Sequence, residues 1–161
     1  MNFYSTITSM RSPGTGLGTI YLFPWSICIV FTLLILVLPV LTGATGILVS
    51  DICFNTIYMD PAFGGDPVLY QHFFWVFGHP EVYILIVPAF GVLSHVLAGV
   101  AGSIIIYGYP SMVLAMGCIS ILGSLVWGHH IYTVGLEADT RSYFTGLTVM
   151  ISLPTGTKLL N

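Results

Sequence analysis

Long apolar runs, separated by short polar segments, make up most of the chain. No acidic or basic residue occurs between Arg11 and Asp51, and the stretch from Tyr21 onward is rich in Leu, Ile, Val and Phe. A helix needs about 20 largely apolar residues to cross the hydrocarbon core of a membrane. This pattern therefore predicts a first membrane span over residues 21–50.

A second apolar stretch lies between Asp66 and Glu137, where Glu81 is the only formally charged residue. It is long enough for two spans, and the turn-forming segment 102–109 with the following Pro110 predicts the break between them. A fourth span, shorter and less apolar, is expected before Lys158. The four expected spans cover residues 21–50, 68–99, 110–127 and 141–158. We therefore expect an all-α integral membrane helical bundle of about four transmembrane helices, forming one membrane domain over residues 1–161.

The composition supports a membrane protein and excludes several other classes. Only 6% of the residues are charged and 56% are hydrophobic, whereas soluble domains carry about 25% charged residues. With three Lys and Arg in total, the chain is not a nucleic-acid binder. The three cysteines show no CxxC spacing, so neither a disulfide framework nor a thiolate metal site is expected. Membrane lipid is thus an expected partner and nucleic acid is not.

Ionisable and imidazole groups inside a membrane are costly and need an explanation. His79 and Tyr83 lie four residues apart in the second span and so share one helix face, whereas Glu81 points roughly to the opposite side. His129 and His130 are adjacent, so both can face one point only where the third span is ending. Three imidazoles without a carboxylate or thiolate companion favour copper over zinc or iron.

Each of these residue types also has a purely structural interpretation. A single buried histidine is usually a core side chain bonded to a neighbouring group, and we interpret His72 and His95 in this way. A membrane-helix threonine usually bonds its own backbone, and a terminal lysine usually extends to the interface. Ser94 nevertheless lies three turns after Tyr83 on the same face. It could therefore continue one polar seam towards Lys158.

Three runs of sequence resemble a known family. DPVLYQHFFWVFGHPEVYILIVPAFGVLSH, VWGHHIYTVGLEADTRSYFT and ISLPTGTK are similar to subunit I of the haem–copper oxidases, in its mitochondrial cytochrome c oxidase form. The resemblance extends from Asn2 to Lys158. That subunit forms a core of about twelve membrane helices, of which this chain resembles the fifth to the eighth.

The resemblance implies a role for each residue of the histidine cluster. His79, His129 and His130 would be the ligands of the active-site copper, copper B. Tyr83 would be the tyrosine that the family links covalently to the ligand at His79, and its phenol would supply an electron and a proton when the O–O bond breaks. Glu81 would be the acid at the end of one proton pathway.

Further residues match the family's proton pathways and haem contacts. Ser94, Thr155 and Lys158 would belong to the second proton pathway, which leads to the active-site tyrosine. Trp75, one turn before the first copper ligand, would pack beside the copper site. Thr148 would lie near the haem.

The resemblance also implies a larger assembly, cytochrome c oxidase of the mitochondrial inner membrane, which reduces oxygen to water and pumps protons. The axial histidines of low-spin haem a and high-spin haem a3 have no counterpart in this sequence, so another chain is expected to supply them. We expect a split subunit, with other fragments of subunit I, subunits II and III and the electron donor cytochrome c as partners. A truncated remnant is the alternative.

Several functions share these motifs. A quinol oxidase of the same superfamily would carry every one of them, because another subunit selects the electron donor. Tyr83 on the His79 face favours oxygen chemistry over nitric oxide reduction. A transporter or channel fragment that uses Glu81 as a proton carrier, and a non-catalytic membrane scaffold fragment, are the alternatives from other classes.

Overall fold

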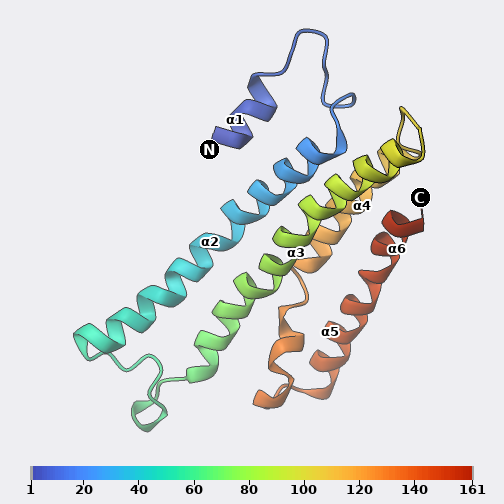
Figure 1. Ribbon diagram of the computed structural model, residues 1–161. Coiled ribbons are helices and arrows are strands. Elements are labelled where there is room, and N and C mark those ends of the chain that lie inside the picture. Colours follow the sequence, from blue (N-terminus) through green and yellow to red (C-terminus); the bar gives the residue numbers. More distant parts are fainter. Residues whose placement is uncertain (1, 161) are drawn as a thin grey trace.

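The computed structural model describes residues 2–160, which form helices joined by loops, with no strand among them. Six α-helices (α) and two short 3₁₀ helices (η) follow one another along the chain (Figure 1). They are α1 (Asn2–Ser9), α2 (Leu22–Phe54), η1 (Pro61–Phe63), α3 (Pro67–Val100), α4 (Tyr109–Gly123), η2 (Trp127–Val134), α5 (Ala138–Met150) and α6 (Ser152–Leu160). The expected all-α fold is confirmed.

Helices α2 and α3 form a long antiparallel pair that runs the length of the molecule (Figure 1). The Asp66 carboxylate caps α3 by accepting a hydrogen bond of 2.9 Å from the Val68 N–H. In the last turn of α2, the Asp51 carboxylate accepts hydrogen bonds from the backbone N–H groups of Tyr58 and Met59 in the connecting loop, at 3.1 and 3.0 Å. Two of the chain's few carboxylates thus fix the turn that makes the pair antiparallel.

The buried core lies where α2, α3 and α4 meet. Its members are Leu22, Val30, Leu33, Val37, Ile84, Val87, Met112, Met116 and Ile119. Other large apolar side chains of the same helices point away from it, among them Leu36, Ile52 and Leu85. Within residues 2–160, three helical segments are long and apolar enough to cross a membrane: Leu22–Phe54, Pro67–Val100 and Tyr109–Val134. Apolar surface on both sides of long helices is typical of a membrane bundle.

The last two expected spans differ in detail from the observed helices. The α-helical part of the third span ends at Gly123, earlier than expected, and η2 continues the segment. The chain then returns along α4 as two consecutive helices, α5 and α6, which break at Ile151 (Figure 1). Each is shorter than the hydrocarbon core requires, so a fourth crossing over 141–158 stays a prediction.

Candidate metal centre

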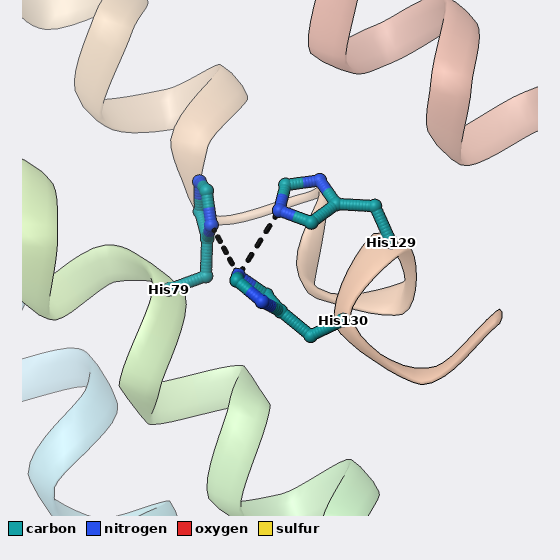
Figure 2. A group of neighbouring side chains, drawn as sticks. All are labelled: His79, His129 and His130. Carbon is teal, nitrogen blue, oxygen red and sulfur yellow. Dashed lines mark hydrogen bonds between the residues drawn. The ribbon is translucent and has the colours of Figure 1, made fainter. Parts of the chain in front are cut away.

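Irregular backbone carries the two adjacent histidines. Segment η2 is a 3₁₀ helix interrupted at Ile131, whose φ of −128° and ψ of 32° are not helical. The expectation that His129 and His130 lie at a helix ending is therefore confirmed. Because the helix is not regular here, both imidazoles turn towards His79 on α3 (Figure 2).

The three imidazoles converge on one point. Nδ1 of His79 lies 2.9 Å from Nε2 of His130, and Nε2 of His129 lies 3.0 Å from the same atom (Figure 2). All three nitrogens lie within 4.8 Å of one another. Nitrogen ligands about 2.0–2.1 Å from a metal lie about 3–3.5 Å apart, so the cluster needs little rearrangement to hold one ion. His79 is only 6% exposed, which keeps this point dry on the α3 side.

A hydrogen bond to Thr148 determines which nitrogen of His129 is free. The Thr148 hydroxyl donates its proton to the Phe144 carbonyl at 2.7 Å, so towards His129 it can only accept. His129 Nδ1 lies 2.9 Å from that hydroxyl and must therefore carry the ring proton. With the proton on Nδ1, Nε2 carries the free lone pair and faces the cluster. An outer hydrogen-bond partner orients a metal ligand in this way. Thr148, expected near a haem, thus contacts a candidate metal ligand.

Aromatic neighbours hold the other two imidazoles. Trp75 stacks on His130 with 3.9 Å between ring centroids and 6° between planes, beside the cluster as expected. Tyr83 lies against His79 with centroids 4.7 Å apart. Nε2 of His79 is buried and has no hydrogen-bond partner among residues 2–160. The histidine thus offers one nitrogen to the cluster and leaves the other without a polar partner, next to a phenol ring.

A glycine on α4 makes room for this tyrosine. A Cβ atom on Gly123 would lie 2.6 Å from Cδ2 and 2.8 Å from Cε2 of Tyr83, closer than such atoms approach one another. The bare α-carbon therefore lets the ring lie directly against α4. Sequence analysis missed this residue, because one glycine among eighteen carries no signal of its own.

The expected polar seam is divided between two cavities. Tyr83 and Thr155 line one of about 220 Å³, whereas Ser94 and Lys158 line another of about 290 Å³. Phe90 lines both, and Lys158 Nζ lies 5.7 Å from its ring centroid. Ser94 donates to the Phe90 carbonyl of its own helix, and Thr155 donates to the carbonyl of Ile151 just before α6, so both bond the nearby backbone as the structural interpretation expected. The lysine Nζ is buried and has no hydrogen-bond partner within the described chain.

The remaining candidates lie outside the cluster. Glu81 is half-buried on α3, and its carboxylate makes no hydrogen bond or ion pair with residues 2–160. His72 Nδ1 accepts a hydrogen bond of 3.3 Å from the Trp127 indole, and His95 Nε2 accepts one of 3.1 Å from the Phe23 N–H. Both histidines therefore have the structural partners that were expected of them.

Comparison with known proteins matches the whole chain to one family. The family described as Cytochrome C and Quinol oxidase polypeptide I matches residues 1–161. The chain is 56% identical to cytochrome c oxidase subunit 1 of Plasmodium berghei and of Plasmodium falciparum, over its full length and 34% of theirs. It is 48% identical to the subunit of Cereibacter sphaeroides, of which it covers 28%.

The chain thus spans about a third of the length of these relatives. Its helices are apolar enough to cross a membrane, and its clustered histidines lie within the matched region. Family membership implies haem and copper as cofactors and a place in a multi-subunit oxidase. The chain is a membrane protein that belongs to the cytochrome c and quinol oxidase polypeptide I family, the haem–copper oxidases.

Proposed function

We propose that His79, His129 and His130 bind the copper ion, copper B, of the oxygen-reducing centre of a cytochrome c oxidase. The observation that carries the proposal is the convergence of three imidazole nitrogens from α3 and η2 on one point. An all-nitrogen donor set without carboxylate or thiolate suits copper. When bound, copper would supply a redox-active Lewis acid for the reduction of oxygen to water.

The residues around the ligands have separate tasks in this proposal. Thr148 holds the proton on Nδ1 of His129, and Trp75 keeps the His130 ring from turning. Tyr83 supplies a proton and an electron from its phenol. Its ring lies beside His79, whose second nitrogen has no polar partner, and this arrangement supports the covalent His79–Tyr83 link that the family resemblance implies.

Two groups of residues would deliver protons to this centre. We assign Glu81 to one pathway and Ser94, Thr155 and Lys158 to the second. The buried amine of Lys158 supports the second assignment, because an unpaired amine inside a membrane bundle is costly and is retained where it has a function. Phe90 lines both the cavity of Lys158 and that of Tyr83, so a proton passing from one to the other would pass beside its ring.

The rest of the catalytic machinery would come from partners. The axial ligands of haem a and haem a3 are assigned to another part of subunit I, because His72 and His95 are already hydrogen-bonded to neighbouring groups. We propose subunits II and III as further partners, cytochrome c as electron donor and the mitochondrial inner membrane as the location. The resemblance of the sequence motifs to the mitochondrial form of the family supports this location.

Metal analysis of the purified complex tests the copper assignment. We expect His79→Ala to lose one copper equivalent per complex and to stop oxygen consumption. The matched control is His95→Ala, a histidine of the same helix outside the cluster, which should keep the copper. Full copper and full turnover after replacement of all three ligand histidines would leave only a scaffold role. Oxygen uptake with reduced cytochrome c and with a quinol, measured in parallel, separates the two electron donors.

A further inference from the structure

The segment that carries two proposed copper ligands has little support of its own. Helix α4 ends at Gly123 and α5 begins at Ala138, and between them η2 is broken at Ile131. A regular helix holds its side chains in place through an unbroken series of backbone hydrogen bonds. Because this series is broken within η2, neighbouring elements must fix the directions of His129 and His130.

The start of η2 is held by α3 and by one side chain of α5. The Trp127 indole donates a hydrogen bond to His72 on α3. From α5, Phe144 packs against Gly128 so closely that a Cβ there would lie 2.2 Å from the ring, and it meets the Trp127 ring edge to face. These contacts all lie before Ile131, so they do not hold the part of η2 that follows the break.

Two threonines of α5 reach the rest of η2 in the same manner. Thr145 and Thr148 lie three residues apart and so share one helix face. The Thr145 hydroxyl donates to the Arg141 carbonyl at 2.9 Å, so it can only accept from the Tyr132 hydroxyl, 2.7 Å away. Thr148 accepts from His129 in the same way. Tyr132 is the first residue after the break at Ile131, so its hydrogen bond to Thr145 holds the part of η2 that follows the break against α5.

We propose that the hydrogen bond from Tyr132 to Thr145 is a tether that positions His129 and His130 for the metal. The inference rests on the copper site proposed above and adds two positioning residues to it. Neither residue makes a hydrogen bond or ring contact with the three histidines within residues 2–160. The bond instead fixes the backbone beyond Ile131 against α5, as Thr148 fixes one imidazole directly. Without the tether, the break at Ile131 would act as a hinge beside the ligands.

Removing either hydroxyl from the assembled complex tests the tether. The variants are Tyr132→Phe, Thr145→Val and their combination. The controls are Tyr143→Phe, an exposed tyrosine of α5, and Thr45→Val, whose hydroxyl bonds only within its own helix. Two quantities are measured: amide hydrogen exchange of residues 127–134, and the rate at which a chelator removes copper.

We expect each single variant to raise both rates about three- to tenfold, the effect of losing one net hydrogen bond. The double variant should do no more than the stronger single, because both remove the same bond. Thr145→Ser keeps the hydroxyl and should retain the rates of the unmodified complex. The two control variants should also leave both rates unchanged.

Three results would overturn the inference. Unchanged exchange in 127–134 would mean that the bond does not hold the segment. Faster exchange with unchanged copper release would mean that the tether does not position the ligands. If the rate increases of the two single variants multiply in the double variant, the two hydroxyls act separately, and this too rejects the tether. Absence of copper from the unmodified complex would reject the proposed function. Hydrogen exchange of residues 127–134 needs no copper, so it would still test whether the bond holds the segment.

Discussion

Replacing Gly123 by alanine tests the packing of the proposed catalytic tyrosine. The new methyl group would lie 2.6 Å from a ring carbon of Tyr83, and this ring is already in contact with His79. Either the ring or α4 must shift. Overpacking of this kind costs about 1–3 kcal/mol. Because the ring lies beside a proposed copper ligand, we expect oxygen turnover to fall as well as stability.

The matched control is Gly117→Ala in the same helix. A Cβ at Gly117 would meet nothing within 4 Å, so this variant should be neutral or gain about 0.5–1 kcal/mol from helix propensity. The assay compares denaturation midpoints and turnover of the purified complexes. In a Tyr83→Leu background the stability cost of Gly123→Ala should largely disappear. Equal effects of the two alanines, or an unchanged cost in that background, would refute the reasoning.

Three further predictions concern single side chains. Thr148→Val removes the acceptor that holds the His129 proton on Nδ1, so copper affinity should fall about tenfold to a hundredfold in a chelator titration, while Thr148→Ser retains it. Lys158→Met removes a buried amine that has no hydrogen-bond partner within residues 2–160, so the thermal midpoint should stay or rise while proton uptake and turnover fall. A fall in the thermal midpoint that parallels the fall in turnover would contradict this assignment. Asp66→Ala removes the cap on the Val68 N–H and should cost about 0.5–2 kcal/mol in the unfolding of the complex, whereas Asp66→Asn keeps most of it.

The sequence determined the membrane character of the chain and the positions of its longest helices. The spans expected over 21–50 and 68–99 correspond to α2 and α3, because the length of an apolar run is a local property. The shared face of His79 and Tyr83 was also predictable, since it follows from helical spacing alone. For the same reason the adjacent pair His129 and His130 indicated a helix ending.

Only the tertiary structure decided how these local elements meet. Fifty-one residues separate His79 from His130, and helix rotation and packing bring their nitrogens to 2.9 Å. The choice of nitrogen in His129 depends on Thr148, a partner from another helix. The expected polar seam to Lys158 is divided between two cavities, both of which Phe90 lines. Helical periodicity fixes which residues share a face, but packing between helices fixes what each face meets, and the chemistry of this site depends on the second.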